Sequence, residues 1–86
     1  METYIRQADL EAIEMEGSWV ILNPNDYTVT KLNALGSVCW ELLTKEQSVQ
    51  SLTEQIQKDF EVSSEIVQND ITQFLGELMD AGLITK

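Results

Sequence analysis

The hydrophobic pattern of this 86-residue chain changes once, near residue 32, and that change limits the folds available to it. Before this point, apolar residues alternate in part with polar ones over short runs, as in strands with one buried face. After it, they recur at three- and four-residue steps, as in amphipathic helices. The sequence therefore predicts an α+β domain with its strands first and its helices last.

Three strands are expected in the first third of the chain. Residues 9–16 alternate in part and predict an exposed first strand, which a Gly-Ser turn at 17–18 ends. Residues 19–22 have the aromatic and branched composition of a strand. The Asn-Pro-Asn-Asp cluster at 23–26 predicts a turn, and residues 27–31 alternate again with period two. We expect a three-stranded antiparallel meander, which leaves two open edges.

Three helices are expected in the remainder. Asn33 and Ser48 are suitable N-caps for the first two, Ser63 or Ser64 for the third, and Gly82 is placed to end the last helix in a left-handed conformation. The predicted buried stripes are Leu35, Val38, Cys39, Leu42 and Leu43, then Val49, Leu52, Ile56 and Phe60, then Val67, Ile71, Phe74, Leu75 and Leu78. Strands followed by helices in so short a chain predict a single winged-helix-like domain over residues 1–86.

Charge restricts the class of partner. Fifteen acidic residues against five basic ones give a net charge of −10, and the basic residues form no stripe. Nucleic-acid binders depend on clustered Lys and Arg, so no nucleic-acid partner is expected, although a DNA-binding winged helix-turn-helix shares the same element order. A neutral or cationic peptide would be attracted. The acidity has a simpler interpretation as well, which is solubility.

Catalytic chemistry finds little support. The chain has no histidine, no metal-ligand or phosphate-loop motif, and a single cysteine, Cys39, within an apolar helical stretch. We therefore expect no catalytic residues, no metal and no cofactor. No apolar run approaches the ~20 residues of a membrane span, and the N-terminus lacks a signal-peptide pattern, so a cytoplasmic protein without a membrane partner is expected.

Because no catalytic motif is present, we interpret the chain as a binding protein and look for its binding surface. The short third strand is expected at a sheet edge, where its backbone can pair with an incoming extended peptide. A helical projection places four residues along one flank of the third helix, with Ile66 farthest from the core. The predicted groove takes backbone from Tyr27, Thr28, Val29, Thr30 and Lys31, an apolar floor from Ile66 and Phe74, and an acidic rim from Asp70 and Glu77. The alternative is that Phe74 is ordinary core and Ile66 an isolated exposed residue.

From residue 19 to 84 the sequence resembles the PqqD family of precursor-peptide recognition domains. The resemblance rests on the order and spacing of short motifs: Leu32-Asn33, Val38, Trp40 and Leu42-Leu43, then Leu52, Ile56 and Phe60, and finally Asp70-Ile71, Phe74-Leu75, Leu78 and Gly82-Leu83-Ile84. One departure is visible, because residues 45–48 read Lys-Glu-Gln-Ser where the family usually has an Asp-Gly turn.

The resemblance implies a function. The leader segment of a ribosomally made precursor peptide would bind as an extra strand against residues 27–31. A stand-alone acidic member is most similar to the lasso-peptide recognition proteins, which present the leader to a separate cysteine protease. A peptide chaperone of the PQQ pathway, which serves a radical enzyme, is the near alternative. A DNA-binding or purely structural subunit remains as a third class.

Overall fold

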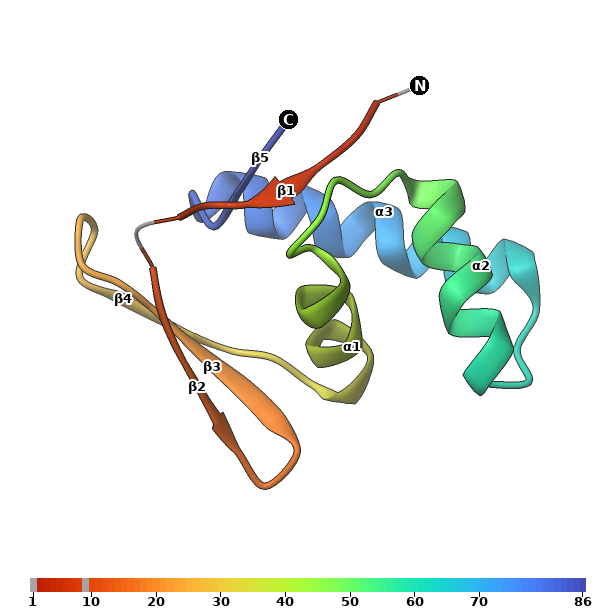
Figure 1. Ribbon diagram of the computed structural model, residues 1–86, viewed down its shortest axis with the longest axis horizontal. Coiled ribbons are helices and arrows are strands. Elements are labelled where there is room, and N and C mark those ends of the chain that lie inside the picture. The colour runs from red at the N-terminus through yellow and green to blue at the C-terminus, as the bar shows by residue number, and fades with distance from the viewer. Residues whose placement is uncertain (1, 9) are drawn as a thin grey trace.

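The computed structural model describes residues 2–8 and 10–86, and it confirms the three-stranded sheet followed by three helices (Figure 1). The sheet comprises β2 (Glu11–Met15), β3 (Ser18–Asn23) and β4 (Thr28–Lys31), antiparallel in the order β2-β3-β4. Residue 9, where we expected the first strand to begin, lies outside the described residues. The central strand β3 supplies the most buried sheet residue, Ile21.

Two tight turns join the strands. Glu16 and Gly17 both have positive φ, the geometry that makes a two-residue hairpin turn match the twist of its strands. In the second turn the side chain of Asn23, itself buried, accepts from the Asn25 N–H at 3.0 Å and donates to the Ala81 carbonyl oxygen at 3.3 Å. Asn23 therefore ties the β3–β4 turn to the end of the last helix.

The helices are α1 (Ala34–Leu42), α2 (Val49–Asp59) and α3 (Ser64–Asp80). Asn33 and Ser48 cap the first two through side-chain hydrogen bonds, as predicted, whereas Ser63 caps α3 without one. After α3, Gly82 has φ +73°, and the Leu83 N–H donates to the Leu78 carbonyl oxygen at 2.9 Å. The predicted glycine C-cap is confirmed.

The core lies between the inner face of the sheet and the three helices. Trp40 is its largest fully buried side chain, and Ile21, Leu52, Ile71 and Leu83 pack in the same cluster. Placing Phe60 in this core was wrong, because that side chain is 42% exposed. Phe60 follows the last turn of α2 in an extended conformation, so the helical spacing that predicted its burial no longer applies.

A second, two-stranded sheet was not predicted. The strand β1 (Ile5–Arg6) pairs antiparallel with β5 (Ile84–Thr85), which brings the chain termini together (Figure 1). Lys86 Nζ lies 3.1 Å from Glu2 Oε1, and this ion pair lowers the pKa of the Glu2 carboxyl through a hydrogen bond and the lysine charge. No helix in the described part of the chain is long and apolar enough to cross a membrane.

Candidate functional site

The strand β4 pairs with β3 alone among the described strands, so its other side is open. The Leu32 N–H donates to the Trp19 carbonyl oxygen at 2.8 Å, which makes this pair a hydrogen-bonded one. Hydrogen-bonded pairs alternate with non-bonded pairs along an antiparallel ladder. Since Thr30 pairs with Ile21 and Val29 with Leu22, Thr30 directs its N–H and C=O toward β3. Val29 and Lys31 therefore direct theirs toward the open side.

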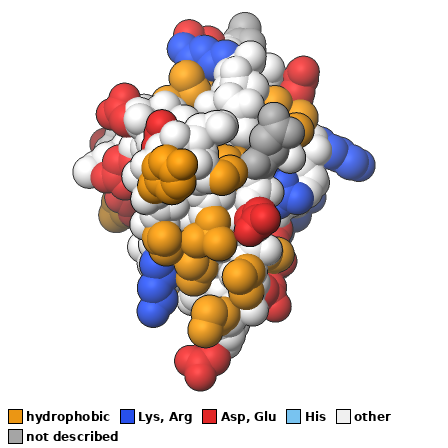
Figure 2. Space-filling model, turned by 90° about the vertical axis from the view of Figure 1, so that its left-hand side faces the viewer, with side chains coloured by type: hydrophobic (Ala, Val, Ile, Leu, Met, Phe, Trp, Pro, Cys, Tyr) orange, Lys and Arg blue, Asp and Glu red, His pale blue; other side chains and the backbone are white. Residues whose placement is uncertain are grey.

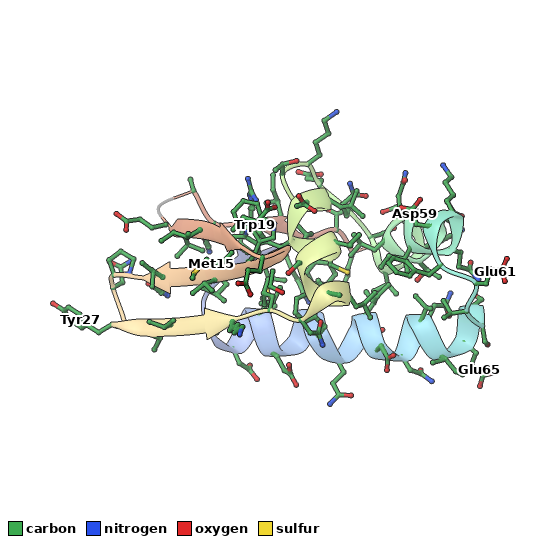
Figure 3. All side chains as sticks on the ribbon, turned by 90° about the horizontal axis from the view of Figure 1, so that it is seen from below. Met15, Trp19, Tyr27, Asp59, Glu61 and Glu65 are labelled. Carbon is green, nitrogen blue, oxygen red and sulfur yellow. The ribbon has the colours of Figure 1, made fainter. Side chains whose placement is uncertain are left out.

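A groove runs beside this open edge. Seen from below, β4 lies between β3 and the C-terminal half of α3 (Figure 3). A hollow of about 150 Å³ is lined by Thr30, Leu32 and Leu78 among others, and a larger one of about 300 Å³ by Leu35, Gly36, Cys39, Asp70, Ile71 and Gln73. Both hollows share Asn33, Phe74 and Glu77 as walls, so they form one continuous feature, which we call the β4–α3 groove.

The floor of the groove depends on a close approach between α1 and α3. Phe74 is half-buried, and its ring lies against the backbone of Gly36, where no side chain intervenes. At the N-terminal end of α1, the Asn33 side chain accepts from the Gly36 N–H at 2.8 Å and so fixes the start of the helix. Beneath them lies Cys39, and burial raises the pKa of its thiol to about 11. The thiol is therefore protonated at neutral pH and behaves as an apolar floor residue.

The α3 side of the groove is acidic. Asp70 and Glu77 are exposed on α3, whereas the register places the Lys31 side chain on the opposite face of the sheet. Glu77 lines both hollows of the groove and Asp70 lines the larger one, so these two carboxylates form its acidic rim. In a chain with a net charge of −10, this rim favours a guest with basic side chains.

The structure brings most of the predicted site residues together and separates three of them. Thr30 and Lys31 of β4 and Asp70, Phe74 and Glu77 of α3 line the groove, and Val29 contributes backbone at the open edge. Thr28 pairs with Asn23, so its N–H and C=O groups point toward β3 and not toward the open side of β4. Tyr27 is not a strand residue, because it has φ +54° and is 92% exposed at the tip of the hairpin, pointing away from the body (Figure 3). Ile66 is 60% exposed, one helical turn beyond Asp70, and is not among the residues lining the groove.

Sequence reasoning missed the wall formed by α1. Asn33, Leu35 and Gly36 line the groove from that helix, although we assigned Asn33 only to the cap and Leu35 only to the core, and gave Gly36 no role. Gly36 carried a signal, since glycine inside a predicted helix is unfavourable unless a close approach requires it.

The outer face of the sheet, away from the helices, carries several exposed or half-buried apolar side chains together with Glu11 and Lys31. By the register, Ile13, Val20 and Lys31 share this face, as do Leu22 and Val29. Ile13, Met15 and Val29 are among the large hydrophobic residues that remain exposed. Figure 2 shows hydrophobic side chains gathered on this side of the molecule. We call Ile13, Met15, Val20, Leu22 and Val29 the outer sheet patch.

The open edge of β4 and the β4–α3 groove belong to a small α+β domain. Residues 18–84 match the family model described as coenzyme PQQ synthesis protein D (PqqD). The chain therefore belongs to the PqqD family, as its resemblance predicted. No match was found among curated proteins.

Two solved structures share this fold. A chain described as TbiB1 in complex with the TbiA(beta) leader peptide superposes with a TM-score of 0.85 at 22% identity, over 93% of both chains. A lasso peptide synthetase B1 complexed with the leader peptide has a TM-score of 0.83 at 14% identity, over 96% of this chain and 98% of that one. At such identities the similarity establishes the common fold.

Proposed function

We propose that this chain is a non-catalytic recognition protein, which binds the leader segment of a ribosomally made precursor peptide as an added strand on β4. The observation that carries the proposal is the open edge at Val29 and Lys31 with the β4–α3 groove beside it. Both solved structures with this fold are described as leader-peptide complexes, which supports a peptide as the guest.

The register specifies how the guest would sit. Guest residues opposite Val29 and Lys31 would exchange backbone hydrogen bonds with them, and their side chains would extend the outer face of the sheet. The guest residue between them, opposite Thr30, would point to the inner face and enter the groove beside Phe74 and Glu77. Affinity would then come from the backbone, and specificity from the side chains that enter the groove.

A processing enzyme, which for a lasso-peptide pathway is a cysteine protease, would act on the presented precursor in the cytoplasm. The outer sheet patch supports this partner, because the guest strand would continue the same face and place its outward side chains next to Val29. Catalysis would reside in that enzyme: this chain has no histidine, and its described residues contain no cluster suited to a metal ion.

Titration of fluorescently labelled leader peptides, followed by anisotropy, tests the proposal. Leaders encoded beside this gene should bind, and the pathway of the tightest leader separates the lasso-peptide role from the PQQ-pathway alternative. Heparin and duplex DNA at low salt serve as controls and should not bind, because they carry the same charge sign as the protein. If DNA binds and every leader fails, the DNA-binding alternative replaces this proposal; if nothing binds, the structural-subunit alternative does.

A further inference from the structure

The turn between β3 and β4 holds Tyr27 in a backbone conformation that is unfavourable for its residue type. Its φ of +54° lies in the left-handed region, where a β-carbon crowds the neighbouring backbone. Glycine enters this region freely and Asn and Asp tolerate it, whereas a bulky aromatic residue rarely adopts it. Asn25 and Asp26 lie in the same turn, yet the positive φ falls on Tyr27. Local turn chemistry therefore gives no reason for a tyrosine here.

The side chain of Tyr27 contributes little to the fold. It is 92% exposed at the tip of the hairpin and points away from the body of the protein (Figure 3). It lies outside the core cluster and lines neither hollow of the β4–α3 groove. An exposed aromatic residue is ordinary by itself, but strained backbone is concentrated at functional sites. A large exposed ring on such backbone indicates a contact with another molecule.

The turn that carries Tyr27 is firmly attached to the rest of the protein. The buried Asn23 side chain donates through Nδ2 to Asp26 Oδ2 within the turn and to the Ala81 carbonyl oxygen at the end of α3, both at 3.3 Å. Its Oδ1 accepts from the Asn25 N–H at 3.0 Å. A ring on so constrained a turn loses little conformational freedom when it binds, which favours affinity.

The proposed leader site brings one end of its guest close to this tyrosine. Val29 is the first residue of β4 with an open backbone, and it lies two residues after Tyr27. Neighbouring strands in the three-stranded sheet are antiparallel, and we take the added strand to be antiparallel as well. Because β4 runs away from the hairpin tip, such a guest runs toward the tip. The part of a precursor that follows its leader therefore emerges beside Tyr27.

We propose that Tyr27 is the anchor by which this chain docks the protease that acts on the leader-bound precursor. This anchor role rests on the proposed function, because it needs a presented precursor. Tyrosine is enriched among the residues that dominate binding energy, and such residues fill pockets on the partner. The Asp26 carboxylate lies in the same turn and the chain has a net charge of −10, so the pocket that fits the ring is apolar with a basic rim.

The experiment uses the intact protein, the full precursor and the leader protease encoded beside this gene, all purified. The measured quantity is the concentration of this chain that gives half of the maximal cleavage rate. Tyr27→Asn removes the ring but tolerates the positive φ, and it should raise that concentration at least about tenfold. The same substitution should raise the Tm by about 2–6 °C, because it relieves the backbone strain.

Glu16→Asn is the matched control. Glu16 also has a positive φ, of 53°, and is exposed at the tip of the other hairpin. This variant should gain stability as Tyr27→Asn does, and it should leave the half-maximal concentration unchanged. Leader affinity, measured by anisotropy, should be the same for the wild type and both variants, because neither residue lines the groove.

The docking role of Tyr27 is rejected if Tyr27→Asn and the wild type have the same half-maximal concentration, if Glu16→Asn raises it equally, or if Tyr27→Asn lowers the Tm. It is also rejected if Tyr27→Asn weakens leader binding itself, which would make Tyr27 part of the leader site. A wild-type protein that binds no leader would reject the proposed function together with the docking role. Normal leader binding with unchanged cleavage would reject the docking role alone.

Discussion

The ring of Phe74 on α3 lies against the backbone of Gly36 on α1, so closely that a β-carbon at Gly36 would stand 2.9 Å from Phe74 Cε1. Real β-carbons do not approach a ring carbon this closely, so any side chain at residue 36 must displace the ring or separate the helices. Phe74 is a shared wall of both hollows of the β4–α3 groove. The position of the groove floor therefore depends on the absence of a side chain at Gly36.

Gly36→Ala should weaken leader binding because the displaced Phe74 ring would fill part of the groove. Overpacking typically costs about 1–3 kcal/mol, and if the bound state carries a strain of this size, affinity falls by roughly fivefold to 150-fold. Gly76→Ala is the matched control, since nothing lies within 4 Å of a β-carbon built there. The control should gain about 0.5–1 kcal/mol of stability from helix propensity and keep full affinity. Equal affinities for the two variants would show that the ring position is irrelevant to binding.

Val29→Pro should reduce leader affinity by at least about tenfold, because proline removes an N–H that points to the guest and adds a ring on that side. Edge strands tolerate proline where the N–H faces solvent, so the fold should persist. Glu14→Pro makes the same change on the opposite edge and should leave leader binding intact. Circular dichroism tests whether both variants fold, and anisotropy measures their affinity for the leader. If Glu14→Pro lost affinity and Val29→Pro kept it, the leader would bind at β2.

Asp70→Lys and Glu77→Lys should each lower affinity for a basic leader several-fold and flatten its dependence on salt. Both carboxylates are exposed, so each contributes only about 0.2–1 kcal/mol at moderate ionic strength. Glu54→Lys changes the net charge equally on the exposed side of α2 and is the control. Affinities measured from low to high NaCl should converge for all variants. If Glu54→Lys has the same effect as the groove variants, the attraction belongs to net charge and the rim has no specific role.

Cys39 should be nearly inert to alkylation in the folded protein. Burial raises the pKa of its thiol from 9.0 to about 11, which lowers the thiolate fraction at pH 8 by about 100-fold, and the thiolate is the reactive form. The raised pKa also means that the folded state holds its proton while the unfolded chain loses one, so stability should fall as the pH rises from 9 toward 11. Iodoacetamide labelling followed by mass spectrometry, with and without denaturant, measures the reactivity of the Cys39 thiol. Fast labelling of the native protein would contradict the burial of Cys39.

Strong local signals explain why the main elements were predictable. The capping residues Asn33 and Ser48 and the C-terminal Gly82 mark helix ends through backbone chemistry that operates within a few residues. Strand order followed from the short turns predicted at 17–18 and 23–26, which the structure places at 16–17 and 24–27 and which allow only antiparallel neighbours.

The remainder depends on contacts between distant residues. The strands β1 and β5 are two residues each, too short to show a period, and they pair residues about 80 positions apart. Tyr27 fits a period-two pattern, yet its positive φ is imposed by the turn. The open side of Val29 and Lys31 was not predictable either, because a one-residue change of register would reverse it. The predicted flank of α3 lines the groove at Asp70, Phe74 and Glu77, where β4 and α1 lie beside the helix, and does not line it at Ile66.

Amide hydrogen exchange of the protein with and without a saturating leader peptide is the most direct test of strand addition. The account predicts that the Val29 and Lys31 amides, which face the open side of β4, become strongly protected on binding, whereas Thr30 is already protected by its bond to β3 and changes little. Unchanged exchange at Val29 and Lys31 in a protein that is fully bound by the leader would contradict it.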